Sequence, residues 1–264
     1  MADQDLAARF LALHRPGSPL LIPNPWDAGS ARILQSLGFA AVATTSGGFA
    51  MTLGRPDGAV TRDEALTHAE AIVSAVSVPV SADLEGGFAA DADGVAETYR
   101  AAVGTGLAGG SLEDFDGSRL YPIDVAADRV AAAAEVTRGR FVLTARAENH
   151  IRGNPDLADT IARLQRYQEA GADVLYAPGV LDPADVRTLL AEVDRPVNVL
   201  LLPGGAGIAE LAELGVSRIS VGGAYAYASL AALVEVGRQL LAGDSRFLDR
   251  VPAGRAAARA AFAI

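Results

Sequence analysis

Eight short apolar segments alternate along this chain with longer segments of helical character. The apolar segments cover residues 19–23, 40–45, 78–83, 107–113, 141–148, 173–178, 196–202 and 217–222. The segments between them carry helix signals: Thr61 precedes one, and in another Pro155 lies near the start and Gly171 at the end. Strand-like runs that alternate with helices favour a parallel sheet covered by helices.

Eight such units within 264 residues fit an α/β fold of the (β/α)₈ barrel type. A doubly wound open sheet is the alternative. It is disfavoured because no GxGxxG sequence follows the first apolar segment, and because acidic residues follow several different segments. We therefore expect one barrel domain over residues 1–264, with an extra helix before about residue 18 and a C-terminal helical segment over 244–264.

The composition excludes several function classes. A net charge of −10 argues against a nucleic-acid or anionic-membrane partner, since both require a basic face. The chain has no cysteine and no lysine, which excludes a thiol nucleophile and a Schiff-base lysine. An acidic N-terminus and the lack of an apolar run of membrane-spanning length predict a cytoplasmic protein.

Charged residues gather where the third, fourth and fifth apolar segments end. Asp83 and Glu85 lie in "VSADLEGG", Glu113 ends the fourth segment, and Arg146 and Glu148 lie two apart in the fifth. Residues two apart project to the same side while a strand stays extended. In a barrel these strand ends meet at one mouth, where acids would repel one another without a cation. Oxygen donors suit Mg²⁺ or Mn²⁺ rather than zinc.

Each of these groups also has an ordinary structural explanation. Acids at strand ends often cap the next helix, Asp114 and Asp116 fit turn positions, and Arg146 alone could be a buried ion-pair partner. The glycines of "LLPGGAG" and "SVGGAYA" could be turns or could hold a phosphate on backbone N–H groups. It is the combination of acids after three consecutive strands with an arginine that favours a metal site.

The same residues carry a family resemblance. "NPWDAGSARILQSLGFAAVATTSGG", "SADLEGGF", "GGSLED" and "TARAE", in this order, resemble the isocitrate lyase/phosphoenolpyruvate mutase superfamily over roughly residues 20–240. The resemblance implies a (β/α)₈ barrel, Mg²⁺, 2-oxo or 2-hydroxy acid substrates and an enolate-like intermediate. It also implies homotetramers in which the last helix is exchanged between neighbouring subunits.

Carried over by position, the resemblance implies a metal site and a substrate site. Asp83 would hold Mg²⁺ directly or through water, supported through water by Glu85 and Glu113, with Asp57 near the water shell of the metal.

For the substrate, Ser46 and Gly47 would offer hydroxyl and N–H groups to a carboxylate, and Arg146 would pair with that carboxylate or the developing oxyanion. Trp26 and Asn198 would add pocket contacts.

The chain departs from the family at the loop after the fourth strand. Isocitrate and methylisocitrate lyases carry Lys-Lys-Cys-Gly there, whereas this chain reads "EDFDGSRLYPIDVAADRV", without asparagine up to Arg146. Tyr121, Ser118 or water remain as proton donors. We expect a Mg²⁺-dependent lyase that cleaves a C–C bond of a small 2-oxo or 2-hydroxy (di)carboxylic acid. Phosphonopyruvate hydrolase or mutase chemistry at a P–C bond, and a non-catalytic 2-oxo acid binding protein, remain alternatives.

Overall fold

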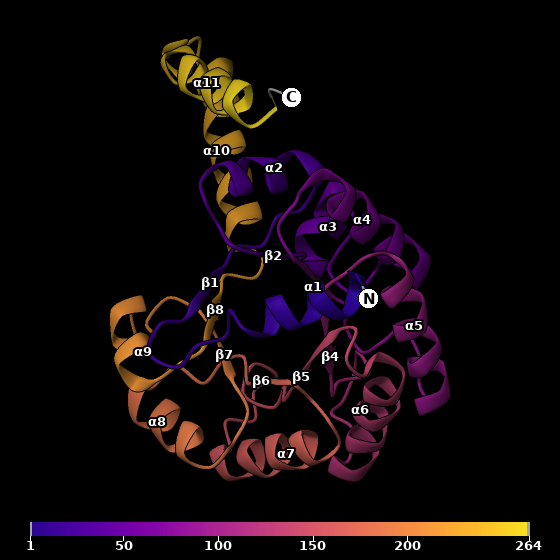
Figure 1. Cartoon of the computed structure of the whole chain (residues 1–264). Coiled ribbons are helices and arrows are strands. Elements are labelled where there is room, and N and C mark those ends of the chain that lie inside the picture. The colour runs from indigo at the N-terminus through magenta and orange to yellow at the C-terminus, as the bar shows by residue number, and fades with distance from the viewer. Residues whose placement is uncertain (1, 263–264) are drawn as a thin grey trace.

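The computed structural model describes residues 2–262, and its centre is a barrel of eight parallel strands (Figure 1). Each strand lies within one of the eight predicted apolar segments. In chain order the strands are β1 (Leu20–Ile22), β2 (Val42–Ala43), β3 (Val80–Asp83), β4 (Gly109–Glu113), β5 (Val142–Arg146), β6 (Val174–Tyr176), β7 (Val197–Leu200) and β8 (Arg218–Ser220).

Helices follow the strands and form the outer layer. The predicted extra N-terminal helix is α1 (Ala2–Leu11). The others before the last strand are α2 (Ala28–Ser36), α3 (Ser46–Thr52), α4 (Arg62–Ala75), α5 (Ala92–Gly104), α6 (Ile123–Thr137), α7 (Leu157–Glu169), α8 (Pro183–Ala191) and α9 (Ile208–Leu214). The (β/α)₈ barrel predicted from the sequence is therefore confirmed.

The strands pair in the order β1-β8-β7-β6-β5-β4-β3-β2, so β1 and β2 are the two ends that must meet. A backbone hydrogen bond from Ala43 N to Pro23 O (3.0 Å) connects β2 to the end of β1. The buried side chain of Asn24 completes the closure: its Nδ2 donates to Thr44 O (3.0 Å), and its Oδ1 accepts from the N–H groups of Val221 and Gly222. One amide side chain thus ties the ends of β1, β2 and β8.

Helix α1 closes the N-terminal end of the barrel. Phe10 is fully buried there against Val142 and Val174, which face the barrel interior. A Cβ at position 109 would lie 2.9 Å from Cε1 of Phe10, so Gly109 makes room for this ring. The barrel floor is therefore a small apolar layer sealed by one helix.

The segment after β8 leaves the barrel (Figure 1). It comprises α10 (Ala224–Leu241), the 3₁₀ helix η1 (Arg246–Arg250) and α11 (Val251–Phe262), which packs against α2. This agrees with the predicted C-terminal helical segment, whose residues 263–264 lie outside the described part. Of the 18 residues in α10 only Ala226 is buried. No helix within residues 2–262 is long and apolar enough to cross a membrane.

His14 extends α1's contact with the barrel interior and makes folding pH-dependent. Its Nδ1 donates to Phe10 O (3.0 Å), which leaves Nε2 facing Nη1 of Arg218 at 3.4 Å. Burial, and then the charge of Arg218, lower the pKa of His14 to about 3. The unfolded chain therefore takes up a proton before the folded one, and stability falls as pH falls from about 6.5 toward 3.

We predict that this histidine costs the fold about 2 kcal/mol of unfolding free energy between pH 7 and pH 5. The substitution His14→Gln keeps a donor and an acceptor but does not titrate. Urea unfolding of both proteins at the two pH values measures the effect, since every other group titrates in both. Equal losses of stability in the two proteins would contradict the assignment.

Candidate active site

Two cavities open at the C-terminal ends of the strands. The central cavity, about 200 Å³, lies within the barrel mouth and is lined by residues that include Ser46, Asp83 and Arg146. The side cleft, about 820 Å³, lies beside it and is lined by residues that include Glu85 and Glu113. Asp57 lines both. The charged residues singled out in the sequence therefore do meet at one end of the barrel.

Arg146, at the end of β5, is the hub of this arrangement. Its Nη1 lies 3.1 Å from Asp83 Oδ1 and 2.9 Å from Glu113 Oε1, while Nε and Nη2 each lie 2.8 Å from Glu148 Oε1. Burial would lower the pKa of Arg146, but the three carboxylates outweigh it and raise that pKa well above its ordinary value. One guanidinium thus links the ends of β3, β4 and β5.

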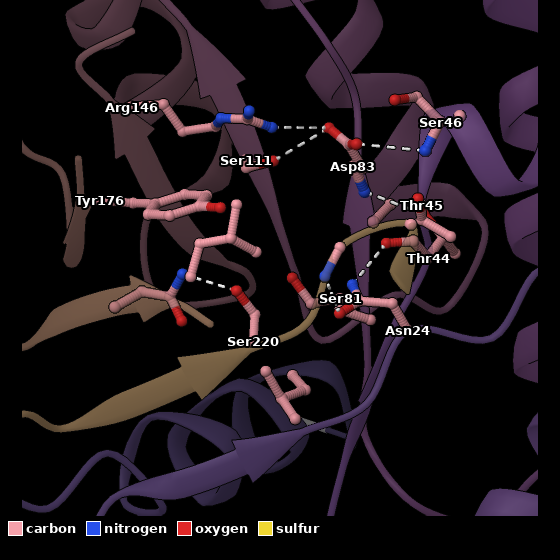
Figure 2. Close-up of a pocket in the computed structure, with 18 of the residues that line it drawn as sticks. Asn24, Thr44, Thr45, Ser46, Ser81, Asp83, Ser111, Arg146, Tyr176 and Ser220 are labelled. Carbon is pink, nitrogen blue, oxygen red and sulfur yellow. Dashed lines mark hydrogen bonds and ion pairs between the residues drawn. The ribbon is translucent and has the colours of Figure 1, made fainter. Parts of the chain in front are cut away.

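Asp83 faces the central cavity with both carboxylate oxygens engaged (Figure 2). Besides Arg146, Oδ1 accepts from Ser111 Oγ (3.4 Å), and Oδ2 accepts from the N–H of Ser46 (3.1 Å). The N–H of Asp83 donates to Thr44 Oγ1 (2.9 Å), which ties the end of β3 to β2. The predicted metal ligand and the predicted carboxylate-binding residue Ser46 are therefore direct neighbours.

Glu85 does not continue the alternation of the strand, because β3 ends at Asp83. Its φ of 48° places it in the left-handed region, and its side chain lines the side cleft. Burial, followed by the charges of Asp83 and Asp57, raises the pKa of Glu85 to about 7. Burial also raises the pKa of Glu113, against the opposing effect of Arg146. Glu113 nevertheless pairs with two guanidinium groups, since its Oε1 lies 2.9 Å from Arg146 Nη1 and its Oε2 lies 3.5 Å from Arg152 Nη2.

Arg129 of α6 holds the loop that carries Glu85. Its Nη1 donates to the carbonyls of Ala89 (2.8 Å) and Ala90 (2.7 Å), and its Nη2 donates to that of Gly86. The guanidinium also lies 4.3 Å from the ring centre of Tyr121, which lines the side cleft. Only 2% of Arg129 is exposed, so it acts as an internal clamp on the loop. Nothing in the sequence pattern marked this residue.

Asp114, next to Glu113, has a purely structural set of contacts. Its Oδ1 accepts from the N–H of Glu148 (2.8 Å), and its Oδ2 accepts from Arg163 Nη1 (2.9 Å) and Tyr167 Oη (2.7 Å). It thereby holds the segment in which Glu148 pairs with Arg146. The turn role considered for Asp116 fits the structure, since its Oδ1 accepts from the N–H groups of Ser118 and Arg119.

The segment around Gly47 borders the central cavity. A Cβ at position 47 would lie 3.2 Å from Asp57 Oδ2 and 3.3 Å from Tyr227 Oη, so a side chain there would crowd the acid. The structure therefore places Ser46, Gly47 and Asp57 together. The contact of Tyr227, from α10, was not predicted.

Two other sequence-predicted contacts have different surroundings. Trp26 lines neither cavity; its carbonyl accepts from His68 Nε2 (3.0 Å), and its Cβ faces Gly48 behind α3. Asn198 lines the central cavity, but its amide is already engaged by Arg218 Nε (2.9 Å) and Ser220 Oγ (3.0 Å).

The donor set fits a hard divalent cation. The groups are carboxylates, two of them with pKa values raised above the ordinary range by burial and mutual repulsion. Within residues 2–262, no three His, Asp or Glu side chains are arranged to ligate one ion directly. Mg²⁺ commonly uses one or two carboxylates and keeps several waters, and that mode matches a single inner acid with others around it.

We predict that Arg129→Met frees the loop 84–91 without unfolding the barrel. Loss of charged hydrogen bonds, each contributing about 1.5–3 kcal/mol, should speed amide hydrogen exchange in residues 84–91 at least about tenfold. Amide exchange in β3 should stay unchanged. In Arg129→Lys, the exchange rate of residues 84–91 should lie between those of the natural chain and of Arg129→Met. Arg138→Met, at an exposed position at the end of the same helix, is the control. Unaltered exchange in the loop would rule out the clamp.

Comparison with known proteins places the chain in a family. Residues 10–241 match the model of the phosphoenolpyruvate phosphomutase family. The uncharacterised protein Rv1998c of Mycobacterium tuberculosis is 36% identical over 238 residues, which cover 88% of this chain and 90% of that protein. The 2-methylisocitrate lyase of Escherichia coli is 30% identical over 218 residues, covering 74% of this chain and 73% of the lyase.

Among solved structures, a candidate lyase or mutase from Burkholderia cenocepacia superposes with a TM-score of 0.85 at 48% identity, covering 89% of each chain. With the barrel and the strand-end acids, these matches lead to one conclusion: the chain belongs to the phosphoenolpyruvate phosphomutase family, within the PEP mutase/isocitrate lyase superfamily.

Proposed function

We propose that this protein is a Mg²⁺-dependent lyase that cleaves a C–C bond of a small 2-oxo or 2-hydroxy carboxylic acid. Proteins of the superfamily act on small acids and typically depend on Mg²⁺. The observation that carries the proposal is the contact of Arg146 Nη1 with both Asp83 and Glu113, directly beside the N–H of Ser46. This contact brings carboxylates and an anion-binding cation together where the central cavity adjoins the side cleft.

Residues of the central cavity and of the side cleft would have different roles in the reaction. Asp83 would hold Mg²⁺, with Glu85, Glu113 and Asp57 acting through water. When bound, Mg²⁺ would polarise the keto or hydroxyl oxygen of the substrate and favour negative charge there.

The chain's own groups supply the rest of the site. Ser46 and Gly47 would orient the substrate carboxylate at the cavity wall. Arg146, held by Glu148, would face that carboxylate or the developing oxyanion; one such donor is worth about 3–4 kcal/mol in measured cases. Tyr121 and Ser118 both line the side cleft, and we propose Tyr121 as the residue that carries a proton to or from the product.

A substrate panel with and without chelator tests this proposal. Purified protein is incubated with 2-oxo acids, 2-hydroxy acids and phosphonopyruvate, with Mg²⁺ or with EDTA, and the products are detected by mass spectrometry. We expect cleavage of at least one carboxylic acid in Mg²⁺ and none in EDTA. Turnover of phosphonopyruvate alone would favour P–C chemistry, and binding without turnover would favour a binding protein.

Asp83→Asn isolates the proposed ligand, because it keeps the shape of the side chain and removes the charge. We expect Mg²⁺-stimulated turnover to fall at least about a hundredfold, as for the loss of one strong electrostatic group. Asp63→Asn, at a side chain that is 82% exposed on α4, is the matched control. Full Mg²⁺-stimulated activity in Asp83→Asn would remove Asp83 from the site.

We also propose a homotetramer in which the C-terminal helices are exchanged between neighbouring copies. The exposed apolar side chains of α10 support a second copy as the covering partner. Leu233 is 66% exposed, Leu240 65% and Leu241 91%. Exposure of these apolar side chains to water is unfavourable unless another protein surface covers them.

Light scattering coupled to gel filtration tests the assembly. We expect a tetramer for the natural chain and smaller species for the double variant Leu233→Asp/Leu241→Asp. Ile208→Asp, which places the same charge on an exposed apolar position of α9, should leave the mass unchanged. A monomeric natural chain would refute the exchange.

A further inference from the structure

Arg218 is a buried cation at the base of the central cavity, beneath the acids described above. Only 5% of the residue is exposed, yet it lines the cavity. Its Nε donates to Asn198 Oδ1 (2.9 Å) and its Nη1 to Thr144 Oγ1 (3.2 Å), and His14 of the floor lies against Nη1. All three partners are neutral: Asn198 and Thr144 do not ionise, and the lowered pKa of His14 favours its uncharged form.

This arrangement differs from that of Arg146 and Arg163, which pair with carboxylates, and from that of Arg129, whose guanidinium donates to three backbone carbonyls. Arg146 contacts three carboxylates, and Arg163 contacts Asp114 and Asp159. Within residues 2–262, Arg218 forms no ion pair, and its Nη2 forms no hydrogen bond. A buried cation without an anion is costly.

The two cavity-lining arginines lie three strands apart, Arg146 on β5 and Arg218 on β8. The hydrogen-bonded register runs from Arg146 on β5 to Tyr176 on β6, then Asn198 on β7 and Arg218 on β8. Arg146 lies at the mouth with Asp83, whereas Arg218 reaches the floor helix through His14. A ligand lying along the cavity would therefore meet one cation at each end.

We propose that Arg218 binds a second carboxylate of the substrate, at the end remote from Asp83 and Arg146. The inference rests on the proposed function, which places the first carboxylate near Ser46. A cavity of about 200 Å³ admits a short acid and is small for a nucleotide or a coenzyme. Arginine presents a planar pair of N–H donors that matches a carboxylate. The preferred substrates are thus small dicarboxylates, and Arg218 determines that specificity.

The test uses pairs of acids that differ only in the distal group. Malate is compared with 2-hydroxybutyrate, and 2-hydroxyglutarate with 2-hydroxyvalerate, by calorimetric binding in Mg²⁺. Oxalate, which has no distal group, reports on the mouth alone. In the natural chain we expect one dicarboxylate to bind about ten- to a hundredfold more tightly than its methyl-ended partner. If the natural chain binds neither dicarboxylate more tightly than its methyl-ended partner, the proposal is wrong, and this result requires no variant.

Arg218→Met then assigns the preference to this residue. It should remove the preference while leaving oxalate affinity within about twofold, and Arg218→Lys should keep part of the preference. Arg100→Met, on the exposed face of α5, removes the same charge elsewhere and should change nothing.

The two proposals fail in different ways. An equal loss of affinity for oxalate and for the dicarboxylates in Arg218→Met would indicate a structural role only and overturn the subsite. Failure of the natural chain to bind oxalate in Mg²⁺ would refute the metal-dependent site itself.

Discussion

The pairing of one buried guanidinium with three carboxylates is the interaction on which the site depends. Asp83, Glu113 and Glu148 come from three neighbouring strand ends, and each would be costly to bury alone. Arg146 offsets that cost for all three at once. Removing one partner of such a buried ion pair usually lowers the free energy of unfolding by about 3–5 kcal/mol. The four side chains are therefore expected to stabilise the fold only as a complete set. Arg152 adds a second guanidinium, whose Nη2 lies 3.2 Å from Glu148 Oε2 and 3.5 Å from Glu113 Oε2, and burial still raises the pKa values of Glu85 and Glu113. A divalent cation would complete the balance of charge.

Around this centre, structural residues hold the loops that carry the functional ones. Arg129 fixes the segment 84–91 through three carbonyls, and Asp114 fixes the start of the segment after β5. Asp116 closes the short connection after β4 by accepting from the N–H groups of its own turn. Each of these residues is charged, lies near the acids of the site and could be mistaken for one of them. Apart from the packing of Arg129 on the ring of Tyr121, their contacts are to backbone or to structural partners, and this distinguishes them from the residues of the candidate site.

The interior of the barrel is polar below the mouth, and this shapes what the central cavity can hold. Barrel interiors are usually filled with branched apolar residues. Here the apolar layer is confined to the floor around Phe10, and above it lie Thr144, Asn198 and Arg218. The hydrogen bonds among these side chains use only part of their donors and acceptors. The cavity therefore continues downward as a polar well with a positive end, which is a reason to expect a ligand with two anionic groups.

The sequence alone was sufficient to predict the fold and to predict that the charged residues at the strand ends lie close together. Eight apolar runs separated by helical segments predicted the barrel. Parallel strands need crossover connections, which are usually helices, and eight such strand–helix units form a closed barrel. The positions of Asp83, Glu113 and Arg146 at strand ends predicted that they would meet, since all strand ends of a barrel share one mouth. What only the tertiary structure decided depends on contacts between residues far apart in the chain. Glu85 turns into the side cleft, Trp26 packs behind α3, Arg129 clamps a loop, and Arg218 lies unpaired at the cavity base. Local sequence carries no signal for these, because a side chain's direction at the end of a strand and the burial of a charge are set by the elements packed around it.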